Sequence, residues 1–191
     1  MKLIGKGRHS LIFLTERNTV IKRFNPGLQK NFEKEIYFLN KLRDFKFVPK
    51  LISYNEKTLE VEMEYISGFS LESLIKNKNI KDLTRVVLKS IDICHFLDKI
   101  HVQKEEMHRP LKHVILSDRV VFIDWERSKE TEKPSNLTQF LHFLCRDSRV
   151  NNIFNLGADY IQNFCKIYKE TYSSELVELL KSKIKQLLDE Y

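Results

Sequence analysis

The stretch KEEMHRPLKHVIL (residues 104–116), followed by FIDWE (residues 122–126), decides the fold of this 191-residue chain. In each part ionisable residues stand next to a short apolar run, and these runs predict two strands, 113–116 and 119–124. Asp124 stands at the end of the second run, where its carboxylate can bind Mg²⁺, a hard cation that prefers oxygen ligands. An Asp that merely ends a strand and opens a turn explains the same pattern.

The residues before this stretch predict a small antiparallel sheet with one helix. Residues 58–66 alternate apolar side chains with glutamates, which is typical of a half-buried antiparallel strand. Phe32, Ile36 and Leu39 recur at the spacing of one helix face. The predicted strands lie in 3–15 (two apolar runs around a Gly-containing turn), 18–24 and 58–66, and the predicted helix is 30–45.

The pattern then becomes mostly helical. Ser70 is a suitable N-cap for a short helix, and Leu83 and Val87 lie on the apolar stripe of a longer one. The predicted helices are 70–78, 81–101, 136–146, 157–172 and 173–191. The chain therefore predicts one α+β domain with a sheet lobe, 1–66, and a mostly helical lobe, 67–191.

The run GKGRHSLI, residues 5–12, fits the Gly-rich pattern G-x-G-x-x-G-x-V. Ser10 stands at the third Gly position and Ile12 at the Val position. Gly5 and Gly7 lack a Cβ, so backbone N–H groups beside them can approach phosphates closely. A Gly-containing β-turn is the simpler explanation of the same residues.

Lys22 and Glu35 are two charged residues on faces that are otherwise apolar. Lys22 shares its strand face with Val20 and Phe24, and a charge that points inward needs a partner. Glu35 lies on the apolar face of the predicted helix, where a carboxylate finds a cation or loses its charge. We therefore predict an ion pair between them. The alternatives are an exposed edge-strand lysine and a helix turned so that Glu35 is solvated.

The order of these features resembles that of a protein kinase, with Gly-rich loop, strand Lys, helix Glu, hinge, catalytic loop and strand Asp in sequence. More closely, the chain resembles a family of small archaeal predicted serine/threonine kinases of atypical, RIO-like type. In that family the loop reads roughly His-Gly-Glu-Met-His-Arg-Pro-x-Lys-His-Val, and the strand ends Ile-Asp-Phe-Glu. The matching residues are Glu106, Met107, His108, Arg109, Pro110, Lys112, His113 and Val114, then Ile123, Asp124, Trp125 and Glu126. The match extends to about Leu144, and Lys104-Glu105 replaces the His-Gly of the family.

The resemblance implies a minimal bilobal protein-kinase-like fold that binds ATP and Mg²⁺. Lys22, held by Glu35, would contact the α- and β-phosphates, and Asp124 would bind the metal. Glu106 would stand at the catalytic Asp position, since Pro110 has no side-chain base. His113 would stand where Asn binds a second Mg²⁺; because imidazole suits softer metals, Mn²⁺ is an alternative. The nucleotide-binding residues implied are Gly5, Gly7, Ser10, Ile12, Lys22, Glu35, Met63, Glu64, Tyr65 and Ile66, the last four as the hinge.

Composition limits the compartment and the partners. The longest apolar runs are far short of a membrane span, and the N-terminal residues lack the apolar run of a secretory signal. Cys94, Cys145 and Cys165 are scattered without zinc spacing, which favours free thiols in a reducing compartment. We therefore predict a cytoplasmic protein with no membrane partner. The net charge of +7 fits a lysine-rich solvated surface, or else an RNA partner.

From the sequence we predict an ATP- and Mg²⁺-dependent phosphotransferase, an atypical serine/threonine kinase whose protein or small-molecule acceptor is unknown. Glu is one methylene longer than Asp, so one alternative is a weak or inactive ATP-binding pseudokinase module in an RNA- or ribosome-related assembly. Another is a small-molecule kinase of the aminoglycoside or choline type, which the run IDWE also resembles. No A-P-E follows IDWE, so regulation by activation-loop phosphorylation is not expected.

Overall fold

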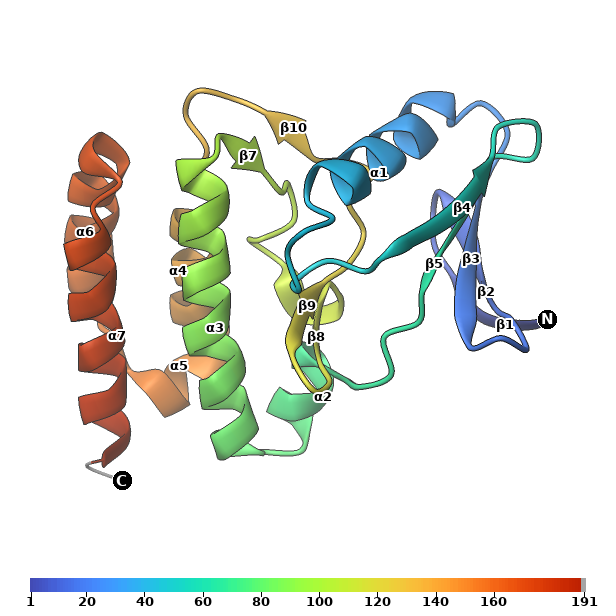
Figure 1. The fold of residues 1–191 in the computed structure, drawn as a ribbon. Coiled ribbons are helices and arrows are strands. Elements are labelled where there is room, and N and C mark those ends of the chain that lie inside the picture. The colour runs from blue at the N-terminus through green and yellow to red at the C-terminus, as the bar shows by residue number, and fades with distance from the viewer. Residues whose placement is uncertain (190–191) are drawn as a thin grey trace. The chain divides into compact units, whose positions relative to one another are not determined.

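The computed structural model describes residues 1–189 and is α+β, with an antiparallel sheet and seven α-helices among those residues (Figure 1). The predicted fold class is therefore confirmed at that level. The chain divides into two compact units, Met1–Gly68 with Ser117–Ser128 and Phe69–Leu116 with Lys129–Tyr191. Within residues 1–189, none of the helices has the length and apolar character needed to cross a membrane.

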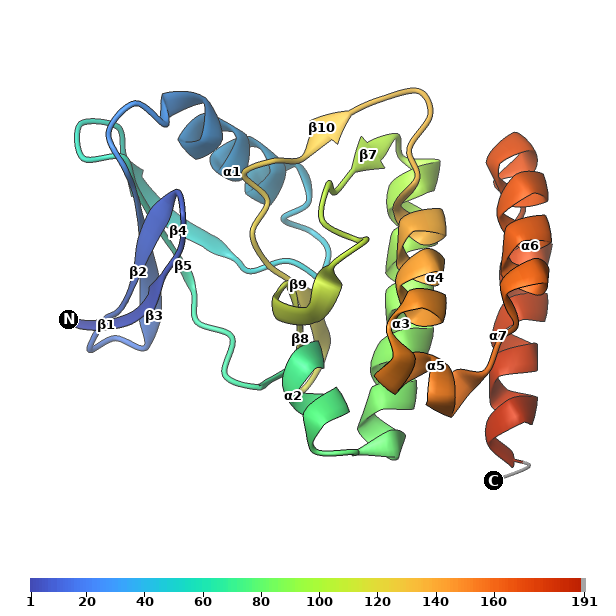
Figure 2. The ribbon, with the colours of Figure 1, turned by 180° about the vertical axis from the view of Figure 1, so that it is seen from behind.

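The first unit is a five-stranded antiparallel sheet in the order β1-β2-β3-β5-β4, with α1 across one face (Figures 1 and 2). Phe32, Phe38 and Leu39 of α1 are buried. The strand β4 was not predicted, because it is an exposed edge strand with no clear alternation. The elements of the sheet unit are β1 (Lys2–Lys6), β2 (Ser10–Leu14), β3 (Thr19–Phe24), α1 (Gln29–Lys41), β4 (Leu51–Asn55), β5 (Glu60–Glu64) and β9 (Val120–Phe122).

The segment Ser117–Ser128 belongs to the first unit although it is distant in sequence. The backbone N–H of Phe122 donates to the carbonyl of Phe47 over 2.8 Å, and the Phe47 ring lies 6.4 Å from the Trp125 ring between centroids. Arg119 adds a charged contact, since its Nη2 lies 2.7 Å from the Glu64 carboxylate. These contacts bring the FIDWE run to the sheet that carries Lys22.

The second unit is mostly helical and is centred on α3, which contacts α2, α4 and α7. Figures 1 and 2 both show α3 and α4 side by side. The short α5 was not predicted, since seven residues are too few for a clear helical period. The elements are β6 (Phe69–Ser70), α2 (Leu71–Lys76), α3 (Ile80–Lys99), β7 (Val102–Gln103), η1 (Pro110–Lys112), β8 (Val114–Leu116), β10 (Lys129–Glu130), α4 (Asn136–Arg146), α5 (Ser148–Phe154), α6 (Ala158–Thr171) and α7 (Ser174–Asp189).

Ser70 caps α2 as predicted, since its Oγ accepts the backbone N–H of Ser73 at 3.2 Å. We expect Ser70→Ala to lower the free energy of unfolding by about 1 kcal/mol, because the N–H loses its acceptor. The urea midpoint should fall with an unchanged slope. Ser182→Ala, at an exposed position of α7, is the control and should not lower it. Equal midpoints for Ser70→Ala and the wild type would contradict the cap.

Candidate functional site

The predicted pair between Lys22 and Glu35 is confirmed. Lys22 Nζ lies 2.9 Å from Glu35 Oε2, and the two residues are 5% and 1% exposed. The strand β3 places Lys22 on the sheet face that α1 covers, together with the buried Val20 and Phe24. Glu35 lies on the buried side of α1, so its carboxylate enters an apolar layer, where it pairs with the Lys22 ammonium.

Two further carboxylates reach the same ammonium. Lys22 Nζ lies 2.7 Å from Asp124 Oδ1 and 2.9 Å from Glu126 Oε2. Trp125 stands between these two acids, and it is fully buried, with its Nε1–H donating to the carbonyl of Phe122 at 2.8 Å. The Trp125 anchor thus fixes both flanking carboxylates on Lys22. No role was predicted for Glu126; the signal in the sequence was a pair of acids on either side of a large apolar residue.

The cluster has more negative than positive charge. Burial alone would lower the pKa of the Lys22 ammonium, but Glu35, Asp124 and Glu126 together raise it above its ordinary value, so Lys22 is protonated. Burial raises the pKa of the Glu35 carboxyl, and Asp124 adds to this, while Lys22 opposes it. One ammonium shared by three carboxylates leaves the site able to accept a further cation.

Oxygen ligands for such a cation are close together. One carboxylate oxygen each of Glu35, Asp124 and Glu126 lies within 4.8 Å of the others, and carboxylates are the ligands that Mg²⁺ prefers. The Asp124 side chain is 32% exposed, which leaves it accessible. Asp124 also has a left-handed backbone, with φ of 68°. Backbone outliers of this kind concentrate at functional sites.

The Gly-rich loop joins β1 to β2, and Gly7 N–H donates to the carbonyl of Ser10 over 2.9 Å. A Cβ added to Gly5 would lie 3.4 Å from Ile12 Cβ, and one on Gly7 would lie 3.6 Å from the Ser10 carbonyl. These are ordinary contact distances, so packing does not require either glycine. Ser10 is buried, and Ile12 pairs with Lys22 across the strands.

His9, in this loop, is a residue that the sequence reasoning missed. Its Nδ1 lies 2.5 Å from Glu126 Oε1, so the loop is tied to the segment that carries Asp124. Sequence offered only a histidine inside a Gly-containing turn, which by itself indicates no partner. The cluster of Lys22, Glu35, Asp124, Glu126 and His9 is called the lysine cluster below.

The predicted hinge, residues 63–66, begins at the end of β5, which lies between β3 and β4 in the sheet. Met63 is buried opposite Val20. The backbone N–H of Glu64 donates to the carbonyl of Lys50 at 2.9 Å, and its carboxylate accepts the N–H of the same residue at 3.1 Å. Glu64 therefore has its backbone donor engaged, whereas Tyr65 and Ile66 follow in a half-buried segment outside regular structure.

Glu106 and His113 belong to the second unit, where they pair with each other at 3.1 Å between Oε2 and Nε2. The segment that precedes them is anchored by the buried Asn136, whose Oδ1 accepts the backbone N–H of Lys104 at 2.7 Å. Pro110 is buried and begins the 3₁₀ turn η1, a position that proline suits. Pro110 therefore begins a turn, and its ring offers no side-chain base.

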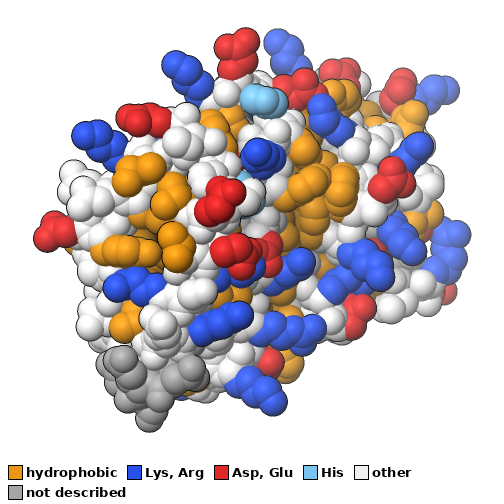
Figure 3. Space-filling view, turned by 60° about the vertical axis from the view of Figure 1, so that its left-hand side comes forward, with side chains coloured by type: hydrophobic (Ala, Val, Ile, Leu, Met, Phe, Trp, Pro, Cys, Tyr) orange, Lys and Arg blue, Asp and Glu red, His pale blue; other side chains and the backbone are white. Residues whose placement is uncertain are grey.

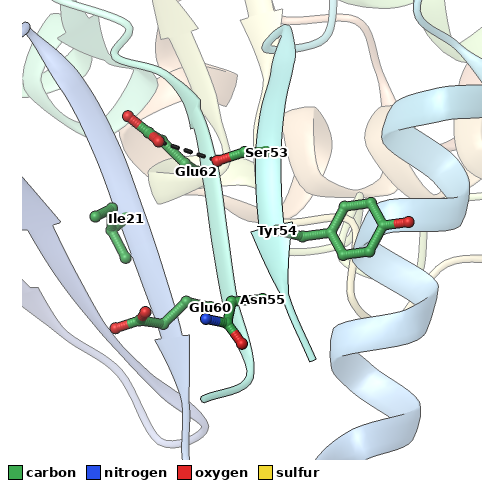
Figure 4. A pocket seen from close by; sticks show the side chains of 6 residues that line it. All are labelled: Ile21, Ser53, Tyr54, Asn55, Glu60 and Glu62. Carbon is green, nitrogen blue, oxygen red and sulfur yellow. Dashed lines mark hydrogen bonds between the residues drawn. The ribbon is translucent and has the colours of Figure 1, made fainter. Parts of the chain in front are cut away.

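The opposite face of the sheet holds a pocket of about 290 Å³ on β3, β4 and β5 (Figure 4). Within it Glu62 is only 9% exposed, although the alternating pattern placed it on the solvent side. Its carboxylate accepts from Thr19 Oγ1 at 2.6 Å, Ser53 Oγ at 3.0 Å and Arg17 Nη2 at 2.9 Å. The Thr19 hydrogen bond, followed by Ser53 and Arg17, lowers the pKa of Glu62. Since strand neighbours alternate, this pocket lies across the sheet from Lys22.

Basic side chains are numerous on the face drawn in Figure 3, and Asp and Glu side chains lie among them. A mixture of signs on this face is what the solvated-surface interpretation of the net charge predicts.

Comparison with known proteins gives one weak likeness. No family model matches the chain. An uncharacterized protein of Methanocaldococcus jannaschii is 26% identical over 115 residues, which are 56% of this chain and 99% of that protein. The kinase resemblance therefore depends on the motifs and on the geometry of the lysine cluster.

Proposed function

We propose that this protein is an ATP- and Mg²⁺-dependent phosphotransferase of atypical serine/threonine-kinase type, with a minimal bilobal kinase-like fold. The observation that carries the proposal is the buried contact of a strand lysine with a helix glutamate, with Asp124 on the same ammonium. Kinases need this lysine–glutamate pair and this aspartate for phosphoryl transfer.

Each residue of the lysine cluster has a role in the proposal. Lys22 binds the α- and β-phosphates, and Glu35 holds its ammonium in place. Gly5 and Gly7 have no Cβ, so phosphates can approach the backbone N–H groups beside them. The segment after β5 binds the base through Tyr65 and Ile66. Glu126 and His9 connect the loop to the Asp124 segment, which supports both sides of the phosphate site.

The donor set fits Mg²⁺, because the three carboxylates supply oxygen ligands and exceed the positive charge beside them. Asp124, the most exposed of the three, would hold the ion. When bound, such an ion neutralises charge that develops on the transferring phosphoryl group. When Asp124 binds the metal ion in place of Lys22, the Lys22 ammonium would become available to the nucleotide phosphates.

Glu106 positions the acceptor hydroxyl in this proposal, and His113 orients the Glu106 carboxylate through the contact between them. His113 is thereby a positioning residue, and the second-metal role that the sequence suggested for it remains untested. The acceptor is a protein or a small molecule.

The test is transfer from γ-labelled ATP by the wild type and by Glu106→Gln. We expect the variant to bind nucleotide normally and to transfer phosphate about 10²- to 10⁴-fold more slowly, which is the usual contribution of a general base. Glu105→Gln is the matched control, since Glu105 pairs with Lys129 at 2.5 Å. Nucleotide binding without any transfer by the wild type would instead support the pseudokinase module, and equal rates for Glu106→Gln would overturn the assignment of Glu106.

A further inference from the structure

The helical unit contains a chain of hydrogen bonds that ends at an exposed hydroxyl. Ser174 Oγ, at the first residue of α7, lies 3.0 Å from His95 Nε2 of α3. His95 Nδ1 lies 2.9 Å from the hydroxyl of Tyr168 of α6. That hydroxyl donates to Asp98 Oδ2 over 3.0 Å. The order is therefore serine, histidine, tyrosine, aspartate, and all four side chains belong to one compact unit.

The other partners of Asp98 fix the direction of the protons along this chain. Asp98 accepts the N–H of Asn136 at 2.9 Å, its side-chain amide at 2.7 Å and the N–H of Leu137 at 3.1 Å. Each of these groups is a donor, so Asp98 acts as an ionised acceptor and the single Tyr168 proton points at it. The Tyr168 oxygen is then the acceptor for His95 Nδ1–H. Nε2 is left with a lone pair that faces the Ser174 hydroxyl.

The surroundings keep His95 in the form that can take a proton. Burial, followed by the charge of Lys99, lowers the pKa of His95, so its imidazole is neutral at neutral pH. Burial raises the pKa of the Tyr168 phenol far above its ordinary range, so this group does not ionise. Tyr168 is fully buried and His95 is half-buried, whereas Ser174 is exposed. This hydrogen-bonded chain of Ser174, His95, Tyr168 and Asp98 is called the relay below. Its Tyr168 end is thus protected from water, and its Ser174 end is open to a reagent.

We propose that Ser174 is an activated nucleophile for acyl transfer from activated esters, with His95 as its general base. Ser174 Oγ attacks the ester carbonyl carbon, its proton passes to His95 Nε2, and the departing alkoxide takes that proton as the C–O bond breaks. The products are acyl-serine and an alcohol, and water then releases the acid and restores the hydroxyl by the same route. Tyr168 and Asp98 are positioning residues that fix the tautomer of His95 and stabilise its protonated ring. This site is independent of the lysine cluster and of phosphotransfer.

The alternative is that these hydrogen bonds only stabilise the packing of three helices. The reactivity of Ser174 distinguishes this structural role from a nucleophilic one. The probe is a biotinylated phosphonofluoridate, on which Ser174 Oγ displaces fluoride and the hydroxyl proton leaves as HF. We expect one adduct on the full chain, mapped to Ser174 by peptide mass, and none on Ser174→Ala. His95→Gln should slow labelling at least about a hundredfold, as loss of a general base does.

Two control variants test whether the labelling depends on the relay. Ser173→Ala should label normally, because Ser173 Oγ donates to Glu175 at 2.6 Å and its hydroxyl does not belong to the relay. Tyr168→Phe keeps the ring and removes the hydroxyl, so it should label more slowly and lose hydrolysis of p-nitrophenyl acetate, with its fold checked by circular dichroism. An unlabelled wild type, or labelling that survives in Ser174→Ala or is unchanged in a folded His95→Gln, overturns the proposal.

Discussion

Replacing Lys22 with methionine is expected to lower the free energy of unfolding by about 3–5 kcal/mol, the usual cost of leaving a buried charge without its partner. The variant keeps most of the length of the side chain but removes the ammonium that contacts Glu35, Asp124 and Glu126. Glu35 is 1% exposed and has no access to water that could replace the lost contact. The loss should appear as a lower midpoint of urea unfolding, measured by circular dichroism.

The effect should depend on pH in a defined direction. Burial already raises the pKa of Glu35 above its ordinary value of 4.5, and loss of the ammonium raises it further. The folded variant then holds a proton that the unfolded chain has released, so its stability falls as pH rises above about 4.5. The difference between wild type and Lys22→Met should therefore be largest at neutral pH and shrink toward pH 4–5.

Two further variants separate charge from packing. Lys22→Met combined with Glu35→Gln removes one of the stranded carboxylates and should recover part of the loss. Arg23→Met, one residue along β3, loses an exposed pair with Glu60 and the contact of its guanidinium with the Phe13 ring, and should change stability by about 1 kcal/mol or less. If Lys22→Met were as stable as Arg23→Met at neutral pH, the buried cluster would not exist in solution. A missing activity in Lys22→Met is meaningful only where the variant is shown to be folded.

Local pattern predicted the first half of the lysine cluster. The alternation of Val20, Lys22 and Phe24, and the apolar neighbours of Glu35, placed two opposite charges inside one layer, and the structure joins them. The cost of an unpaired buried charge was sufficient to predict the contact. The prediction of this ion pair required only that one helix packs on one sheet, and no information from distant parts of the chain.

The second half of the cluster could not be predicted in this way. Glu126 and His9 are separated by 117 residues, and contacts such as the packing of Trp125 against Phe47 bring the Glu126 segment to the sheet unit. The same reason applies to the relay of Ser174, His95, Tyr168 and Asp98, which joins three helices through side chains as far as 79 residues apart in sequence. Periodicity identifies faces, whereas these contacts depend on how the faces are rotated and offset.

Glu62 shows where a pattern predicts the wrong environment. Strict alternation assigned it to solvent, yet Thr19, Ser53 and Arg17 surround its carboxylate on the open face of the sheet. The burial of such a residue depends on its neighbours across the strands. Which neighbours it has is set by the register of the paired strands, and the pattern within one strand does not contain that register.

Asp124→Asn is expected to reduce phosphotransfer strongly while leaving the stability of the fold close to that of the wild type. The amide oxygen can still accept a hydrogen bond from Lys22, and Asn tolerates the left-handed backbone that Asp124 adopts at φ of 68°. Loss of one charge also relieves repulsion among three carboxylates on one ammonium, so the free energy of unfolding should change by less than about 1 kcal/mol. Transfer should fall at least about a hundredfold, because the metal supplies several kcal/mol of charge stabilisation.

The measurements are label transfer from ATP, Mg²⁺-dependent nucleotide binding and urea unfolding on the same preparations. Asp118→Asn is the matched control, because its side chain is 76% exposed and it lies in the same segment, Ser117–Ser128. That control should leave transfer, binding and unfolding unchanged. Full transfer by Asp124→Asn would remove the metal role of this residue, and with it the main support for phosphoryl chemistry at the lysine cluster. Loss of transfer together with loss of fold would show that Asp124 acts as a structural partner of Lys22.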